Sequence, residues 1–171
     1  MENLKENKDA KKKYYSTLKL QLAPIISWEF KDNFQIEMKK SLLDLSKLAK
    51  ISAQSKWEKK NWDLELNLKE KVIIVTDTKL NIVFACNSMY KMNGYREKEV
   101  LGKSPKMFQG EETSVTVSNE IREAIALQKP FVKEVLNYKK TGEPYHCLIE
   151  GFPIFNTKGI LVNFIAFEKA A

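Results

Sequence analysis

Hydrophobic positions in the first third of the chain change their spacing near residue 32. In residues 18–30, leucines alternate with polar residues before Pro24, which predicts an extended arm because proline cannot continue a helix. From there, apolar residues recur every three or four positions, which predicts an amphipathic helix over residues 32–62, with Asp32 or Asn33 as its N-cap. The apolar stripe of this helix is Phe34, Met38, Leu42, Leu45, Ala49 and Ala53.

The remainder of the chain reads as strands and short helices. The predicted strands are VIIVTD (72–77), NIVFA (81–85), FVKEVLNYKK (131–140), PYHCLIEGFPIF (144–155) and ILVNFIAFE (160–168). Short helices are predicted over 87–95 and after it, and a longer one begins at Ser114 and stops before Pro130. Gly142 and Gly159 suit the last two hairpin turns. This order predicts an α+β domain with a five-stranded antiparallel sheet.

Composition limits the chain to one domain of ordinary size and an appendage. It has 171 residues, of which 43% are hydrophobic and 30% are charged. That is enough apolar material for one core, and it excludes wholesale disorder. The patterns divide the chain into a disordered basic tail (1–17), an arm and helical segment for dimerisation or capping (18–66) and a folded domain (67–171).

Charge and cysteine content bear on partners and compartment. The net charge of +7, from 29 basic and 22 acidic residues, is spread along the chain rather than gathered in one patch, so we expect no nucleic-acid partner. No apolar run approaches the ~18 residues of a membrane span, and the N-terminus lacks the apolar core of a signal peptide. Two cysteines cannot build a disulfide framework. We therefore expect a cytoplasmic protein that does not contact a membrane.

The helix predicted over residues 32–62 implies a partner surface. It would make about eight turns with a single apolar stripe, and one sheet face is too short to cover all of them. We therefore expect a homodimer formed through this helix. The alternative is a monomer in which the stripe covers the chain's own sheet.

Several strings in residues 70–169 resemble the PAS superfamily, the sensory domains of signalling proteins. VIIVTDTKLNIVFACNSMYKMNGY resembles the opening of that fold, in which strand, turn, strand and a short helix end at Gly94-Tyr95. EVLGKSPKMFQGEETS, IREAI and LNYKKTGEPYHCLIEGFPIF resemble its flavin-binding LOV branch. The resemblance implies a PAS fold with short helices on one face of the sheet, here preceded by a long N-terminal amphipathic helix.

One departure from the LOV pattern excludes the photochemistry of that branch. There the string after the glycine reads Asn-Cys-Arg and then Phe-Leu-Gln, and the aligned residues here are Ser104, Pro105, Lys106, Met107, Phe108 and Gln109. LOV photochemistry joins the flavin to the cysteine thiol, and proline offers no nucleophile, so no adduct can form through Pro105. Cys86 and Cys147 do not align with that position, and we expect Cys86 to be a small buried residue.

The resemblance also implies a set of ligand contacts. The matching positions are Ser104, Lys106, Gln109, Arg122, Asn137, Cys147 and Glu168. Gln109 and Asn137 match positions that contact the flavin ring, and Arg122 matches one that contacts the phosphate. Lys106 replaces a second phosphate-binding arginine, which keeps the charge but loses the two-pronged geometry.

Three of these positions carry a different residue type from the LOV branch. Ser104 stands for an asparagine on the ribityl chain, and Cys147 stands for an asparagine at the ring edge. Glu168 stands for a glutamine near the reactive ring nitrogen, and an ionised Glu168 would accept a hydrogen bond without donating one. Each lost partner costs about 1–3 kcal/mol, so the residues support FMN only in part.

Other cofactors and reaction chemistry have little support in the sequence. His146 is the single histidine and lies on a predicted strand, whereas heme-binding PAS domains place their ligand on a helix, so heme is not favoured. No phosphate loop, metalloprotease motif or nucleophile elbow is present. The buried-carboxylate candidates are Glu150 and Glu168, and neither belongs to a base–nucleophile pair, so we expect no enzyme.

Three functions stay open on the sequence. The first is a stand-alone sensory module for signal transduction that binds a small ligand, has no output domain of its own and acts on a signalling protein in trans. The second is a ligand-free docking module, whose interior would be filled by Met89, Met92, Met107 and Phe108. The third is a photoreceptor that holds flavin noncovalently, without adduct chemistry and with Trp or Tyr electron donors.

Overall fold

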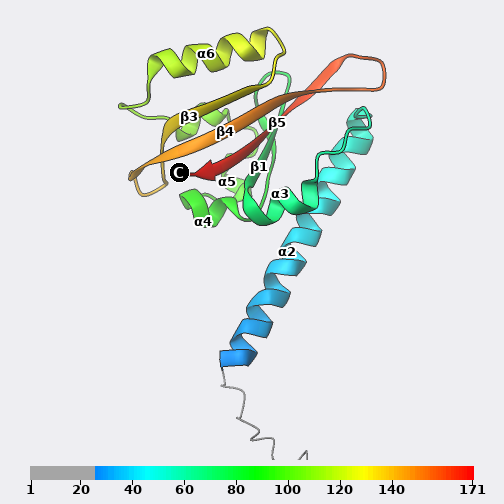
Figure 1. Ribbon diagram of the computed structural model, residues 1–171, viewed down its shortest axis with the longest axis vertical. Coiled ribbons are helices and arrows are strands. Elements are labelled where there is room, and N and C mark those ends of the chain that lie inside the picture. Colours follow the sequence, from blue (N-terminus) through cyan, green and yellow to red (C-terminus); the bar gives the residue numbers. More distant parts are fainter. Residues whose placement is uncertain (1–25) are drawn as a thin grey trace, which may run out of the picture. The chain divides into compact units, whose positions relative to one another are not determined.

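The computed structural model describes residues 26–171, with side chains described from residue 34 onward. Residues 38–171 form one compact unit around a five-stranded antiparallel sheet of order β2-β1-β5-β4-β3 (Figure 1). The predicted tail at 1–17 and the first part of the predicted arm, 18–25, lie outside the described residues. The division of the chain between residues 66 and 67 stays a prediction.

The sheet confirms the α+β fold expected from the strand pattern. Its strands are β1 Val72–Asp77, β2 Ile82–Ala85, β3 Phe131–Tyr138, β4 Pro144–Phe155 and β5 Leu161–Ala170. The first and last strands meet at its centre, because β5 pairs with both β1 and β4. The β-branched run of β1 is therefore covered on both faces and is buried along nearly its whole length.

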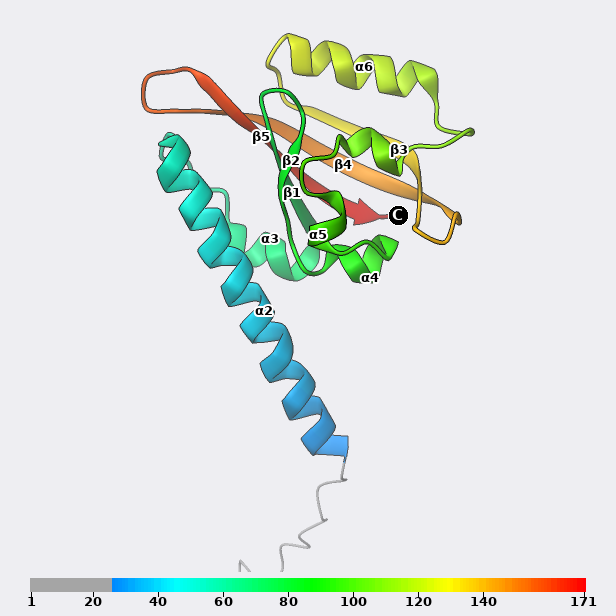
Figure 2. The ribbon, with the colours of Figure 1, turned by 180° about the vertical axis from the view of Figure 1, so that it is seen from behind.

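Four helical elements follow β2, and the pattern predicted three of them; the 3₁₀ turn lies in a stretch that was expected to be irregular. They are α4 Met89–Asn93, α5 Glu97–Val100, the 3₁₀ turn η1 Pro105–Phe108 and α6 Val115–Ala126. The Ser114 hydroxyl caps α6 by accepting a hydrogen bond from the Val117 amide at 3.3 Å. Helix α6 runs beside β3 in both ribbon views (Figures 1 and 2).

The N-terminal helix differs from its prediction at both ends. Helix α2 spans Ile26–Ser55, so residues 26–30 of the predicted arm are helical and neither Asp32 nor Asn33 is an N-cap. The chain leaves the helix at Lys56, whose φ of 51° is left-handed, and Trp57 then pairs with Asn156 as an isolated β-bridge. The predicted C-terminal part, KWEKKNW, is therefore not helical. A further helix, α3 Leu64–Glu70, leads into β1.

The apolar stripe predicted for this helix is mostly wrong. Among the described side chains of α2, Leu48 and Asp44 are buried and Leu45 packs beside the core, whereas Met38 and Leu42 are 48% and 59% exposed. Phe34, Ala49 and Ala53 of the predicted stripe are exposed as well. The spacing of apolar residues predicts an amphipathic helix but does not determine which of its flanks packs against the domain.

Asp44 explains why a carboxyl is buried at this contact. Its two oxygens accept hydrogen bonds from the backbone N–H and the side-chain amide of Asn87, at 2.8 and 2.7 Å. Burial nevertheless raises the pKa of Asp44 above its ordinary value, although these bonds and nearby Lys47 oppose the shift. An ion pair between Lys47 and Glu97 lies beside it. The polar contact therefore selects the flank of α2 that packs on the domain.

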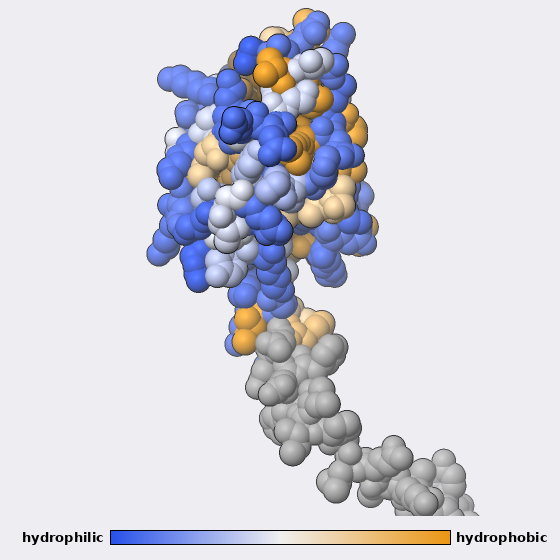
Figure 3. Space-filling model, turned by 90° about the vertical axis from the view of Figure 1, so that its left-hand side faces the viewer, coloured by the Kyte–Doolittle hydropathy of each residue, from blue (hydrophilic) through white to orange (hydrophobic). Residues whose placement is uncertain are grey.

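The surface of the described chain gives no sign of a bilayer-spanning element. Within residues 26–171, none of the helices combines the length and the apolar character that a membrane span requires. The side shown in Figure 3 is mostly hydrophilic, with hydrophobic residues scattered among the charged ones.

Candidate functional site

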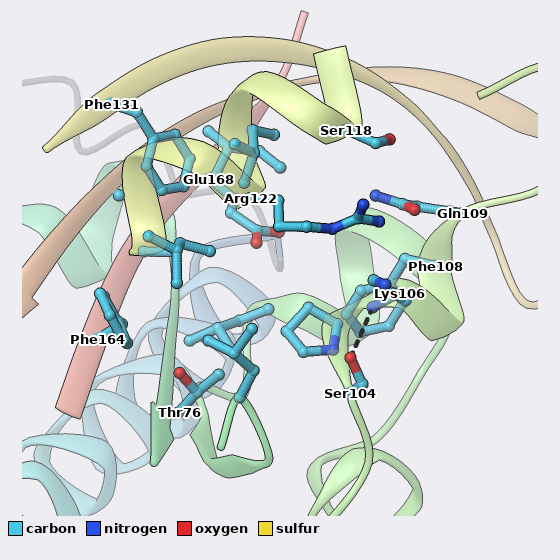
Figure 4. Close-up of a pocket in the computed structure, with 18 of the residues that line it drawn as sticks. Thr76, Ser104, Lys106, Phe108, Gln109, Ser118, Arg122, Phe131, Phe164 and Glu168 are labelled. Carbon is cyan, nitrogen blue, oxygen red and sulfur yellow. Dashed lines mark hydrogen bonds between the residues drawn. The ribbon is translucent and has the colours of Figure 1, made fainter. Parts of the chain in front are cut away.

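A cavity of about 360 Å³ lies between the inner face of the sheet and the elements η1 and α6 (Figure 4). Two paired residues at the centre of its floor, Gly151 on β4 and Ala166 on β5, have little or no side chain. The Phe131 ring already covers Gly151, since a Cβ there would stand 2.3 Å from its carbons. The small residues leave space that larger ones would fill.

Helix α6 covers this space rather than packing into a core. Its apolar residues Ile121 and Ile125 border the cavity, and no residue of the helix is fully buried. Apolar walls come from the strands as well, through residues such as Ile74, Ile149 and Phe164. The hollow is therefore mainly apolar, with a small number of polar groups at fixed places.

Six of the seven predicted contact residues border this one cavity. They are Ser104, Lys106, Gln109, Arg122, Asn137 and Glu168. Pro105, which the sequence resemblance aligns with the LOV cysteine, also borders it. Cys147 does not: it is fully buried behind the wall, where its thiol faces Glu168 Oε2 at 3.9 Å.

One end of the cavity carries exposed positive charge. Lys106 and Arg122 are both exposed, and Figure 4 shows the Arg122 side chain extending toward the side where Gln109 and Lys106 lie. The Arg122 guanidinium donates to Asn119 at 3.1 Å. Ser104 caps η1, because its hydroxyl accepts from the Lys106 amide at 3.4 Å. Together, η1 and α6 hold two cations at the mouth.

The other polar groups of the cavity are buried. Asn137 and Glu168 are each 4% exposed, and Glu168 lies on the central strand β5. Burial raises the pKa of Glu168 to about 7, and the Cys147 thiol opposes the shift only weakly. Burial and the neighbouring Glu168 charge also raise the pKa of Cys147. With its pKa raised in this way, Glu168 can carry a proton near neutral pH, and a neutral carboxyl can donate a hydrogen bond.

Two further buried polar residues lie near this end and were missed from the sequence. Tyr145 Oη and Asn93 Nδ2 have no hydrogen-bond partner among the described residues. Burial and the charges of Cys147 and Glu168 raise the pKa of Tyr145. Tyr145 pairs with Asn137 across the sheet. Its place two residues before Cys147, on the same face of one strand, is the signal that could have found it.

The remaining candidates lie elsewhere. Glu150 is on the outer face, ion-paired to Lys71 at 2.8 Å, and His146 Nδ1 lies 2.7 Å from Glu134 Oε1 near the surface. Cys86 is 1% exposed, as expected for a small buried residue. In residues 34–171 no group of three or more His, Cys, Asp or Glu is placed to hold a metal ion.

The side chains expected to fill the interior of a ligand-free domain do so only in part. Of Met89, Met92, Met107 and Phe108, only Phe108 borders the cavity. Met89 is fully buried in the core, and Met92 and Met107 pack against that core.

Comparison with known proteins extends this description. A family model described as "PAS domain" matches residues 70–169. Protein TWIN LOV 1 of Arabidopsis thaliana is 40% identical over 88 residues, which is 51% of this chain and 22% of that protein. Phototropin-2 of Oryza sativa subsp. japonica is 33% identical over 102 residues, or 58% of this chain and 11% of that protein. A blue-light-activated histidine kinase of Brucella canis is 35% identical over 85 residues, or 50% and 17%.

These curated relatives are much longer than the matched region, since the chain spans about a fifth of their length or less. Among solved structures, the one described as "The light state structure of the blue-light photoreceptor Aureochrome1 LOV" has a TM-score of 0.58 at 26% identity, over 62% of this chain and 85% of that one. Another, described as "Flavin Analogue Sheds Light on Light-Oxygen-Voltage Domain Mechanism", has a TM-score of 0.60 at 22% identity, over 65% and 86%, and shows the shared fold alone.

Proposed function

The chain belongs to the PAS domain family, and from this premise we propose that it is a sensory module that holds a small ligand noncovalently between its sheet and α6. The observation that carries the proposal is the convergence of six separate polar residues on one apolar cavity of about 360 Å³. Ligand sites are typically hollows of ~300–1,000 Å³ with apolar walls and a few placed polar groups. A domain filled by its own side chains would lack this space.

The distribution of polar groups describes the ligand. Two cations at the mouth, Lys106 and Arg122, suit an anionic group, because an anion there stays near water. The apolar walls suit a flat hydrocarbon or aromatic body, and the buried amide of Asn137 suits a polar edge. Riboflavin 5′-phosphate (FMN) combines all three features and is our candidate ligand.

The residues present fit FMN without the cysteine chemistry of its LOV relatives. Asn137 and Gln109 would meet polar atoms of the ring, and Lys106 and Arg122 would meet the phosphate. Thr76 supports the fit, because its hydroxyl oxygen on the cavity wall is buried without a hydrogen-bond partner among the described residues. Bound flavin would supply blue-light absorption and electron exchange. Pro105 lines the cavity, so a light response of this chain would not involve a thiol at that position.

The proposal is tested by titrating the purified protein with FMN and with riboflavin, which lacks the phosphate. We expect both to bind, and FMN to bind about tenfold or more tightly, because each hydrogen bond to a charged group is worth about 1.5–3 kcal/mol. The double variant K106Q/R122Q should lose that preference while still binding riboflavin. Lys129→Gln, an exposed residue just after α6, is the matched control and should keep the preference.

Two results would contradict this proposal. Equal affinity for FMN and riboflavin in the unmodified protein would mean that Lys106 and Arg122 do not bind the phosphate. Failure of both flavins to bind, with no organic molecule released on denaturation, would transfer support to the ligand-free docking module.

We further propose that the exposed flank of α2 joins two copies of the chain. Met38 and Leu42 lie one turn apart on this helix and are 48% and 59% exposed, and Leu43 is 58% exposed. Apolar side chains at helical spacing on a free flank suit a second identical helix. Such a contact would let a change in the domain alter a protein–protein interface.

Equilibrium sedimentation tests the dimer. The variant Leu42→Glu should raise the dissociation constant about tenfold or more, because the interface would bury an unpaired carboxylate. Leu66→Glu, on the exposed side of α3 at 55% exposure, is the control and should leave association unchanged. A monomer at all protein concentrations, or an equal effect of both variants, would contradict the interface.

A further inference from the structure

Glu168 is a carboxyl group that faces the ligand cavity without a cationic partner among the described residues. It is 4% exposed, and its side chain contacts the Cys147 thiol, 3.9 Å from Oε2. The strands on either side place apolar residues opposite it, Val72 on β1 and Ile149 on β4. None of the ion pairs within residues 34–171 includes Glu168.

Charged and titratable groups near Glu168 come from several of the surrounding elements. On β4, Tyr145 and Cys147 lie near Glu168 but do not border the cavity, and η1 and α6 contribute Lys106 and Arg122 at its mouth. Glu168 also borders a second hollow, together with Lys69, Glu70, Lys71, Lys91 and Lys169. Lys71 is paired with Glu150, and Lys69 with Glu65.

A carboxyl in this setting holds its proton more firmly than one in water. Removing a carboxylate from water without a compensating charge is costly, so burial favours the neutral form. The raised pKa of Glu168, to about 7, agrees with that geometry. In its neutral form the group carries one O–H donor, directed from the central strand of the sheet.

Resting on the proposed function, we propose that Glu168 donates a hydrogen bond to the bound ligand as a carboxylic acid, so that ligand affinity falls as the pH rises above neutrality. The ligand atom it meets would be an uncharged acceptor, such as a ring nitrogen or a carbonyl oxygen. A cationic ligand group would pair with the ionised form instead, but Lys106 and Arg122 border the same cavity and disfavour a cation there.

Riboflavin titrations at about pH 6 and about pH 8 test the proposal without interference from a phosphate group. The dissociation constant of the unmodified protein should rise about tenfold between these values, since each pH unit above the pKa weakens a proton-dependent contact about tenfold. Glu168→Gln should bind with nearly equal affinity at both, because an amide donates at either pH. Glu150→Gln, on the outer face, is the control and should retain the pH dependence. A pH-independent affinity in the unmodified protein, or one that rises with pH, would overturn the proposal.

A second measurement needs no ligand. Because the folded-state pKa of Glu168 is raised from 4.5 to about 7, its contribution to stability is fully present below 4.5 and is lost as the pH rises toward 7. The free energy of unfolding of the unmodified protein, relative to Glu168→Gln, should therefore decrease over that range. If this decrease is seen while riboflavin does not bind at either pH, the flavin assignment fails and the neutral Glu168 is supported. If the difference does not depend on pH, the Glu168 proposal fails whatever the flavin result.

Discussion

The two faces of the sheet use the same strands in opposite ways. On the outer face the rings of Phe152 and Phe167 lie 6.0 Å apart, and Trp62 contacts them at 5.7 and 6.3 Å between ring centroids. On the inner face the neighbouring residues, Gly151 and Ala166, are small and form the floor of the cavity. Alternation along a strand therefore produces a filled layer on one side and a hollow on the other.

Carboxyl groups on the two faces show the same contrast. Glu150 on the outer face has an ion pair with Lys71 and remains partly exposed, with 28% of its side chain accessible. Glu168 is 4% exposed, has no ion pair among residues 34–171 and has a thiol beside it. The carboxylate on the filled face is therefore paired within the chain and the one on the hollow face is not. The contrast holds for these carboxyl groups and not for every polar group, because Trp62 Nε1 on the filled face also lacks a hydrogen-bond partner among the described residues.

The largest effect on stability is expected from truncating Trp57, which packs on the filled face. This residue is 7% exposed, and its Nε1 donates to Asn163 Oδ1 at 2.8 Å, while the Asn163 amide donates to the Thr76 carbonyl at 3.0 Å. We expect Trp57→Ala to lower the free energy of unfolding by about 3–5 kcal/mol, as for other buried aromatic truncations. Urea denaturation followed by circular dichroism measures this change.

A matched control lies on the same face. Val132 on β3 is 59% exposed, so Val132→Ala should change the free energy of unfolding by about 0.5 kcal/mol or less. If Trp57→Ala behaves like this control, the segment after α2 does not stabilise the outer face, and the contrast between the faces is not one of packing.

A smaller effect on stability, but a large one on binding, is expected from filling the hollow face. Ala166 is only half-buried at the centre of β5 because the cavity lies over it. Ala166→Leu should place its side chain in that space, weaken flavin binding at least about tenfold and change the free energy of unfolding by less than about 1.5 kcal/mol. Flavin titration and urea denaturation of the same preparation report the two effects separately.

The control for this variant is Ala126→Leu at the exposed end of α6, which should affect neither quantity. Unaltered flavin binding by Ala166→Leu would place the ligand outside the cavity. A large loss of stability would instead show that the inner face is already filled.

Local patterns predicted the strands well because each local cue agreed with the tertiary contacts. The run VIIVTD is β1 at the predicted bounds, and Ser114 caps α6 as expected. Helix α2 is the exception. Its end at Ser55 depends on Trp57 docking against the distant β4–β5 hairpin, and its packed flank depends on Asp44 bonding to Asn87. The spacing of apolar residues along the helix predicts neither of these two contacts.

The candidate site was predicted in part for a similar reason. Six residues that border the cavity could be named from the strings that resemble the LOV branch, since their spacing follows the strands and helices of the fold. Cys147 does not border the cavity, and Tyr145 and Asn93 were missed, because burial and hydrogen-bond satisfaction depend on neighbours from other strands and helices. The protonation of Glu168 depends on the same surroundings.

The sequence by itself determined the strand and helix order, the PAS resemblance and the loss of the nucleophile at Pro105, because these depend on residue identity and short-range period. Only the tertiary structure decided that the inner face is hollow, that α2 packs through Asp44 and Leu48, and that Glu168 is buried without an ion pair among residues 34–171. Those features are set by distances between residues far apart along the chain. Free space and desolvation are properties of the assembled surfaces, and no single segment carries them.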